Sequence, residues 1–180
     1  MTERTYIALL RGINVGGKVL KMADLRAAVA ALGFDDVRTY LQSGNMVFGA
    51  AKTEVGALSR RISDAIRDHA SLDVAVMVRD AEAWTRMVAA NPYPSAALFP
   101  KTVHAFILDG VPDSARLDTL RARQPANEEW QLIDGTLYLH TPDGFGRSVL
   151  GGTIERLIKV PATARNWNTV LSLRDMACVS

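Results

Sequence analysis

The stretch YIALLRGINVGGKVLK, residues 6–21, decides the fold. It opens with an apolar run, continues into a polar, glycine-rich segment at residues 11–18, and is followed by a helical pattern of apolar residues from Met22. A short apolar run that ends at glycines indicates a buried strand. The order strand, glycine loop, helix places backbone N–H groups and a helix N-terminus around an anion. We therefore interpret this loop as a binding site.

The segments that follow extend this stretch into a complete folding unit. Apolar residues recur at helical spacing as far as Leu32, and Gly33 ends the helix. Two strand-like runs then flank residues 42–45, which predicts a β-hairpin. We expect strands at residues 5–10, 37–41, 46–48 and 74–78, and helices at residues 22–32 and 55–66. This β-α-β-β-α-β order is that of a ferredoxin-like unit, an antiparallel sheet with both helices on one face.

The second half of the chain repeats the pattern. Residues 80–100 predict a linking helix and a proline-bearing loop, which separate the two halves. Beyond them, we expect strands at residues 103–108, 130–133 and 137–140, and helices at residues 114–123 and 154–158. The repeat ends differently, because residues 161–169 stand where a last strand would be expected. The sequence thus predicts an α+β fold of two ferredoxin-like halves, residues 1–79 and 101–180, with an extra C-terminal helix on the second.

Composition and charge exclude several classes of protein. With 21 Lys and Arg against 19 Asp and Glu, the formal net charge of +2 is too small for a protein that coats nucleic acid. The single cysteine, Cys178, cannot form an internal disulfide and suits a reducing compartment. The apolar run near the N-terminus is too short for a signal peptide or a membrane span. We therefore expect a cytoplasmic protein that does not interact with membranes.

Three long motifs resemble a known family. They are LRGINVGGK at residues 10–18, TYLQSGN at residues 39–45 and ATARNWNT at residues 162–169, and the run YLHTPDGFGRS at residues 138–148 is also similar. In this order they resemble the bacterial family catalogued as domain of unknown function 1697, over nearly the whole chain. The resemblance implies an α+β fold of ferredoxin-like parts in a small cytoplasmic protein. It supplies no catalytic residues.

The expected topology brings two distant loops to the same end of the first sheet. The first two strands run parallel with the third between them, so the loop after the first strand lies beside the hairpin turn. The residues brought together are Arg11, Asn14, Gly16, Gly17, Lys18, Gln42, Ser43 and Asn45. Arg11 can offer a bidentate fork, and Lys18 a point charge, to phosphate or carboxylate. The alternative is a tight turn whose glycines serve only geometry.

Two segments of the second half are further candidates. DGFGRS at residues 143–148 precedes a helix and resembles an anion loop, or else a plain loop with Ser148 as helix N-cap. RNWNT at residues 165–169 surrounds an aromatic with polar groups, as in a nucleotide site, or starts a helix capped by Asn168 or Thr169. We expect the first segment at the opposite end of its sheet from the second. The candidate ligand-binding residues here are Arg147, Arg165, Asn166 and Asn168.

Three functions are compatible with these residues. The first is a non-catalytic module that binds a small anionic ligand, such as phosphate, a carboxylate or a nucleotide, in the first loop cluster. The second is single-stranded RNA binding on the sheet, where Tyr6 and Phe48 are the aromatics of the central strands. The third is an enzyme of unknown reaction that uses Arg11, Asn45 and Arg165 for electrostatic stabilisation. We favour the first.

Metal and cofactor chemistry have no signature in the sequence. The histidines His69, His104 and His140 are scattered, and none has a partner at a metal-ligand spacing. The first glycine loop fits neither the P-loop pattern nor the dinucleotide fingerprint, so we do not expect an NTPase. The sequence therefore predicts no metal site and no cofactor.

Overall fold

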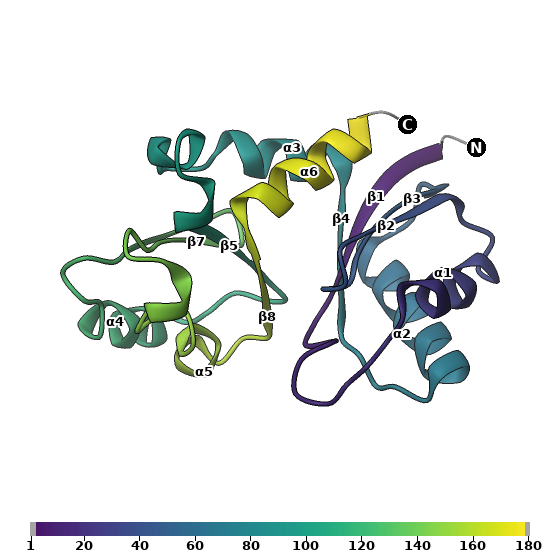
Figure 1. The fold of residues 1–180 in the computed structure, drawn as a ribbon, viewed down its shortest axis with the longest axis horizontal. Coiled ribbons are helices and arrows are strands. Elements are labelled where there is room, and N and C mark those ends of the chain that lie inside the picture. The colour runs from purple at the N-terminus through teal and green to yellow at the C-terminus, as the bar shows by residue number, and fades with distance from the viewer. Residues whose placement is uncertain (1–2, 179–180) are drawn as a thin grey trace. The chain divides into compact units, whose positions relative to one another are not determined.

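The computed structural model describes residues 3–178, in which the β-α-β-β-α-β order occurs twice (Figure 1). The first series is β1 (Glu3–Leu10), α1 (Met22–Ala30), β2 (Asp35–Tyr40), β3 (Asn45–Ala51), α2 (Val55–Ala70) and β4 (Val76–Asp80). The connection holds α3 (Ala81–Ala89) and two 3₁₀ helices, η1 (Pro94–Ala97) and η2 (Pro100–Thr102). The second series is β5 (Val103–Leu108), α4 (Ser114–Ala122), β6 (Glu129–Ile133), β7 (Thr136–His140), η3 (Phe145–Arg147), α5 (Ile154–Ile158) and β8 (Ala162–Asn166), followed by α6 (Trp167–Cys178). The predicted α+β fold with two similar halves and a C-terminal helix is confirmed.

The chain divides into two compact units. The first contains the chain up to Arg86 together with the segment from Ser172 onwards, and the second is Met87–Leu171. Each unit holds one four-stranded sheet in which all neighbouring strands are antiparallel.

The first sheet has the strand order β2-β3-β1-β4. β1 is an interior strand, paired with β3 on one side and with β4 on the other, and residues 6–10 are all buried. An uninterrupted apolar run suits this position, because both faces of the strand are removed from water. Helices α1 and α2 lie on one side of this sheet (Figure 1) and share a core with Tyr6 and Phe48.

Helix α2 shows how the sequence pattern builds this layer. Leu58, Ile62 and Ile66 recur every four residues and are fully buried against the sheet. Burying each of these side chains stabilises the fold by about 1.5–3 kcal/mol. The helix ends at Ser71, whose left-handed backbone has φ +54°. Like the other helices of residues 3–178, α2 lacks the combination of length and apolar character needed to cross a membrane.

The second sheet has the strand order β6-β7-β5-β8, with α4 and α5 on one side (Figure 1). Leu120 of α4 and Ile154 of α5 are fully buried in a core with Phe106 and Leu139 of the sheet. This sheet repeats the strand order of the first. The repeat is therefore one of topology as well as of element order.

The last strand corrects our expectation that the repeat ends differently. β8 pairs antiparallel with β5, from Leu108 opposite Ala162 to His104 opposite Asn166. The segment shows no alternation of large apolar side chains, because Ala162 and Ala164 are small. It is an edge strand held by its backbone pairing, and such a strand leaves a weak apolar pattern in the sequence.

Candidate functional site

The loop after β1 and the turn between β2 and β3 meet at one end of the first sheet, as the sequence predicts. We call residues 11–21 the β1 loop and residues 41–44 the β2–β3 turn. The backbone N–H of Leu10 donates to the carbonyl of Gly44 at 2.8 Å. A Cβ atom at Gly44 would lie 2.6 Å from Cδ1 of Ile13, so the approach of the two segments requires glycine.

Asn14 fixes the shape of the β1 loop. Its backbone is left-handed, with φ +56°. Its side-chain amide donates to the carbonyls of Leu20 at 3.0 Å and Gln42 at 2.5 Å, and its Oδ1 accepts from the N–H of Leu20 at 3.0 Å. Its backbone N–H donates to the carbonyl of Lys18 at 2.6 Å. One side chain thus closes the loop and ties it to the β2–β3 turn.

Arg11 and Lys18 bring positive charge to the surface of the β1 loop. Both residues are exposed. The backbone N–H of Arg11 donates to the carbonyl of Ala75 at 2.9 Å, which anchors the start of the loop. The Lys18 ammonium donates to the carbonyl of Asp73 at 2.9 Å. An ammonium has three donors, so this contact leaves capacity for an anion.

Gly16 and Gly17 form the exposed tip of the β1 loop. Their φ angles are +59° and +97°, and a Cβ atom at either position would meet no heavy atom within 4 Å. The flanking residues Val15 and Lys18 form an isolated antiparallel bridge across the tip. The positive φ angles explain the choice of glycine, and the open backbone can be approached closely by a ligand.

The polar residues in and directly after the β2–β3 turn are divided between surface and interior. Gln42 and Ser43 are exposed, whereas Asn45 is fully buried. The Asn45 amide donates to the carbonyl of Tyr40 at 2.8 Å and to the hydroxyl of Ser43 at 2.9 Å. Asn45 therefore stabilises the hairpin, and Gln42 and Ser43 are the side chains that face solvent next to the β1 loop.

The second candidate loop surrounds a carboxylate of the chain itself. We call residues 141–153 the β7 loop; they enclose Glu128, whose exposed fraction is 3%. The Ser148 hydroxyl donates to Oε2 of Glu128 at 2.8 Å, and the backbone N–H groups of Val149 and Leu150 donate to its oxygens at 2.7 and 3.1 Å. The loop does bind an anion, but an internal one. Sequence reasoning missed Glu128 because it lies outside the loop, just before β6.

Ser148 does not cap the following helix, contrary to our expectation. Its hydroxyl accepts from the N–H of Gly151 at 2.8 Å, while α5 begins only at Ile154. Ser148 thus holds a turn within the loop and donates to Glu128 at the same time. The prediction was wrong because the helix starts later than the glycine-rich run suggests.

Arg147 lies beside a small cavity of mixed charge. The cavity has a volume of about 170 Å³, and its lining includes Arg147, Glu128 and Asp143. Asp143 accepts from the side-chain amide of Asn127 at 2.6 Å. Two carboxylates next to one guanidinium do not favour binding of a further anion.

An aromatic stack packs the β7 loop onto the second sheet. The ring of Phe145 lies 3.9 Å from that of His104, centroid to centroid. A Cβ atom at Gly151 would lie 2.8 Å from the Phe145 ring, so this packing requires glycine. Burial lowers the pKa of His104 to about 4. The buried Nδ1 of His104 has no hydrogen-bond partner within residues 3–178, which suits a neutral core imidazole.

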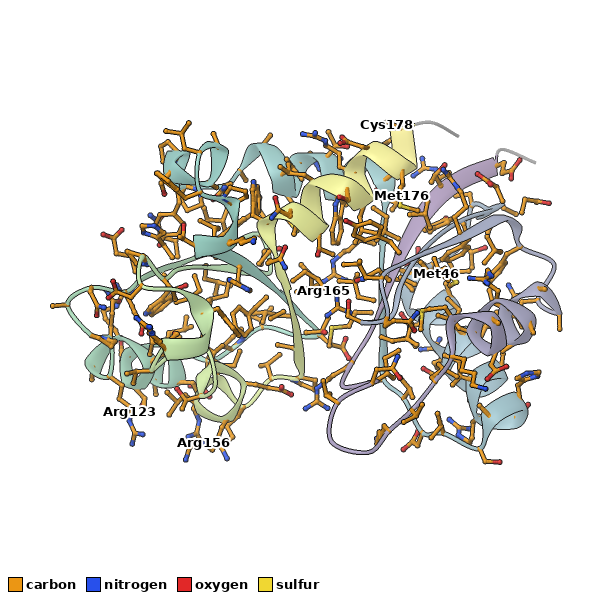
Figure 2. The ribbon with its side chains drawn as sticks, viewed as in Figure 1. Met46, Arg123, Arg156, Arg165, Met176 and Cys178 are labelled. Atoms are coloured by element: carbon orange, nitrogen blue, oxygen red, sulfur yellow. The ribbon has the colours of Figure 1, made fainter. Side chains whose placement is uncertain are left out.

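Arg165 is a buried strand residue. It is 8% exposed, whereas Arg123 and Arg156 extend outward from the region of α4 and α5 (Figure 2). Its Nη1 donates to the hydroxyl of Thr163 and to the carbonyl of Ala164, both at 2.8 Å. Burial lowers the pKa of Arg165 to about 10, so the guanidinium still carries its charge at neutral pH.

Asn166 occupies the capping position that we assigned to Asn168 or Thr169. Asn166 directly precedes the first helical residue, Trp167, and its Oδ1 accepts from the N–H of Thr169 at 3.0 Å. Asn168 is exposed in the first turn of α6. The prediction was wrong because β8 runs into α6 without a loop, so the last residue of the strand is the cap.

The β7 loop and Arg165 lie at the same end of the second sheet, not at opposite ends as we expected. His140, the last residue of β7, pairs with Val103, and Asn166 pairs with the adjacent His104. Both β7 and β8 run antiparallel to β5, so both end where β5 begins. Our expectation wrongly treated these two strands as opposed in direction.

Most residues proposed for the two alternative functions, RNA binding and catalysis, are buried. Tyr6 and Phe48, the aromatics of the RNA interpretation, are 2% and 0% exposed and stack on each other at 5.6 Å. Of the residues in the enzyme interpretation, Asn45 and Arg165 are buried and Arg11 is exposed. The candidates that belong to the second unit are Arg147, Arg165, Asn166 and Asn168.

Comparisons with known proteins identify a family and a fold. A family model described as Protein of unknown function (DUF1697) matches residues 3–138. Among solved structures, the conserved bacterial protein SP0830 from Streptococcus pneumoniae is similar over 98% of this chain and 99% of its own, with 21% sequence identity and a TM-score of 0.77. No curated protein matches the chain. The likeness to SP0830 shows a shared fold, and the chain belongs to the DUF1697 family, as its motifs predict.

Proposed function

We propose that the protein binds a small anionic ligand, a phosphate, carboxylate or nucleotide, at the β1 loop and the β2–β3 turn. One observation carries the proposal: Arg11 and Lys18 are exposed on a loop whose shape Asn14 fixes from within. A loop that is ordered before the ligand arrives loses little entropy on binding. The two cations are therefore presented in a prepared arrangement.

The chemistry of the exposed groups supports an anion of this size. A guanidinium can hold phosphate or carboxylate in bidentate fashion, and an ammonium adds a point charge. The open backbone at Gly16 and Gly17 and the exposed side chains of Gln42 and Ser43 add polar groups around the same rim. The β7 loop is the weaker candidate, because its donors already bind Glu128.

We also propose that both halves are ferredoxin-like units and that the protein acts in the cytoplasm. The strand orders β2-β3-β1-β4 and β6-β7-β5-β8, each with its helices on one side, support the first point. The exposed free thiol of Cys178 supports the second, because free thiols persist in reducing compartments.

Titration with inorganic phosphate, acetate and ADP, followed by amide NMR shifts, tests the binding proposal. We expect saturable shifts at residues 11–21 and 41–44 for at least one of these anions. Arg11→Ala removes the bidentate group and should weaken the affinity about tenfold, equivalent to about 1.4 kcal/mol, at an unchanged melting temperature.

Arg60→Ala is the matched control, because Arg60 is an exposed arginine on α2. It should leave the affinity within about twofold of the native value, because Arg60 belongs to neither the β1 loop nor the β2–β3 turn. Equal weakening by both substitutions would show that the affinity depends on the net charge of the protein and not on Arg11 in particular. Absence of saturable shifts for all three anions would overturn the proposal.

A further inference from the structure

A serine and a histidine meet at the end of β7, in the second unit. Oγ of Ser95 lies 3.3 Å from Nε2 of His140. Ser95 belongs to η1 and His140 is the last residue of β7, so residues distant in the chain form this contact. Both side chains are half-buried, which leaves the pair partly accessible. A hydroxyl at this distance from an imidazole nitrogen has the arrangement of a nucleophile and its base, which is often looser before substrate binds.

Two residues lie beside the imidazole. The ring of Tyr93 stacks on that of His140, with 5.3 Å between centroids and 26° between planes. Glu129 of β6 is directly opposite His140 in the antiparallel register. Opposite residues project to the same face with Cβ atoms about 4.5–5.5 Å apart, so Glu129 lies beside His140 on this face of the sheet.

The Glu129 carboxylate also acts electrostatically on Tyr93. The pKa of the Tyr93 hydroxyl is raised, first by burial and second by the negative charge of Glu129. Tyr93 stacks on the His140 ring, and Glu129 is opposite His140 in the strand register. Serine, histidine and glutamate therefore gather at one place.

The surroundings of Ser95 supply an apolar surface. The N–H groups of Leu98 and Phe99 donate to the carbonyl of Ser95 at 3.1 and 2.8 Å, which folds the chain back into a turn. In this turn Leu98 is 79% exposed and Phe99 is 63% exposed. Large apolar side chains left in solvent next to a polar pair can contact the apolar part of a substrate.

We propose that Ser95, His140 and Glu129 form a hydrolytic site for esters with an apolar acyl group. Ser95 is the nucleophile, His140 is the general base, and Glu129 is a positioning residue that orients the imidazole. Leu98 and Phe99 contact the acyl chain. This site lies in the second unit and is independent of the anion site proposed for the first.

The reaction follows from these roles. Oγ of Ser95 attacks the ester carbonyl while its proton passes to Nε2 of His140. The tetrahedral intermediate collapses, the ester C–O bond breaks, and the leaving alcohol takes the proton from the imidazolium. Water then attacks the acyl-serine with His140 as base, which releases the carboxylic acid and restores the serine. The sum is one ester and one water converted to an acid and an alcohol.

Covalent labelling of the full chain with an alkyl fluorophosphonate tests the nucleophile. Oγ displaces fluoride from phosphorus, so the intact mass rises by one phosphonyl group and peptide mapping identifies the labelled residue. We expect the label on Ser95 and its loss in Ser95→Ala. In His140→Gln the labelling rate should fall by about 100-fold or more, because the general base is gone.

Matched controls separate the site from general reactivity. Ser114→Ala removes an exposed serine of the same unit, and His69→Gln removes an exposed histidine. Both should label at the native rate. Circular dichroism melting of each variant shows whether it folds. Peptide mapping of the labelled native chain identifies the nucleophile even if a variant does not fold. No labelling of the native chain, or a label on another residue, overturns the proposal.

Turnover of p-nitrophenyl butyrate tests the positioning role of Glu129. Glu129→Gln keeps the size of the side chain and removes the charge that orients the imidazole. We expect kcat to fall about tenfold at an unchanged KM, because the substrate itself does not contact Glu129. A change in KM alone, or in neither constant, would remove Glu129 from the site. Native turnover equal to that of Ser95→Ala would overturn the hydrolytic proposal.

Discussion

The β1 loop and the β7 loop have the same character in the sequence, glycines beside a cation ahead of a helix, yet the chain uses them differently. In the β7 loop, backbone N–H groups already bind the carboxylate of Glu128. In the β1 loop the amide of Asn14 satisfies the loop's own backbone, and Arg11 and Lys18 are exposed. What distinguishes the two is that the β7 loop binds a carboxylate of the chain itself, whereas the β1 loop is held by a neutral amide.

The two loops also differ in packing. Phe145 of the β7 loop stacks on His104, and Leu150 is fully buried, so this loop is part of the core of its unit. The tip of the β1 loop is open, with Val15 and Val19 64% and 69% exposed. A loop that contributes to the core resists change, whereas an open, internally fixed loop can receive a ligand without repacking.

Removing the internal anion should produce the largest effect. Glu128→Ala leaves the Ser148 hydroxyl and the backbone N–H groups of Val149 and Leu150 without their acceptor, in places that are partly or fully buried. Unsatisfied buried donors cost about 1–3 kcal/mol each, so we expect the free energy of unfolding to fall by about 3–5 kcal/mol. Urea denaturation measures this loss. Glu82→Ala, on the exposed side of α3, should change it by less than about 0.5 kcal/mol, and equal losses would contradict the comparison.

Removing the amide of the β1 loop should cost somewhat less. Asn14→Ala deletes the hydrogen bonds to Leu20 and Gln42 and places alanine at φ +56°. We expect the free energy of unfolding to fall by about 2–3 kcal/mol. Asn14→Gly tolerates this φ and should lose roughly 1 kcal/mol less, again by urea denaturation. If Asn14→Gly were less stable than Asn14→Ala, the left-handed backbone at this position would not explain the stability lost in the alanine variant.

Acid should weaken the second unit through His104. Its folded-state pKa of about 4 lies below the ordinary value of 6.5 because burial disfavours the imidazolium. Between these pH values the unfolded chain binds a proton that the folded chain does not, so stability falls as pH drops from 6.5 to 4 and then levels. We expect a contribution of about 2 kcal/mol.

The measurement is the difference between the native chain and His104→Phe, which keeps an aromatic ring against Phe145. The native free energy of unfolding should fall relative to that of His104→Phe as pH drops from 7 to 4.5, because only the native chain has the histidine that takes up a proton on unfolding. Parallel curves for His104→Phe and the native chain would refute the assignment.

Elements with a strong local pattern were predictable from the sequence. The strand at residues 103–108 is observed as expected, because its continuous apolar run fits an interior strand. β8 was harder to recognise, because Ala162 and Ala164 leave little apolar pattern and backbone pairing with β5 holds it in place. The periodicity of apolar residues in a sequence reflects which side chains are buried. This pattern is weak in a strand that is stabilised by backbone hydrogen bonds and not by its side chains.

The candidate site residues were predictable in place but not in the contacts that they make. The meeting of the β1 loop with the β2–β3 turn follows from topology, and the bond from Asn14 to the carbonyl of Gln42 bears it out. Whether an amide faces a ligand or its own backbone depends on long-range contacts that a motif does not contain. The carboxylate of Glu128 and the contact of Ser95 with His140 have the same origin in tertiary structure.

The smallest expected effect concerns Arg147, and it separates the two loops most sharply. In a phosphate titration, Arg147→Ala should change the affinity by at most about twofold, against about tenfold for Arg11→Ala. The reason is local: the N–H groups of the β7 loop are bound to Glu128, and the carboxylates of Glu128 and Asp143 line the cavity next to Arg147. Phosphate would meet two negative charges there and no free backbone donor from Val149 or Leu150. Equal weakening by the two substitutions would show that an internal carboxylate does not prevent a loop from binding a second anion. The two loops would then differ only in their packing.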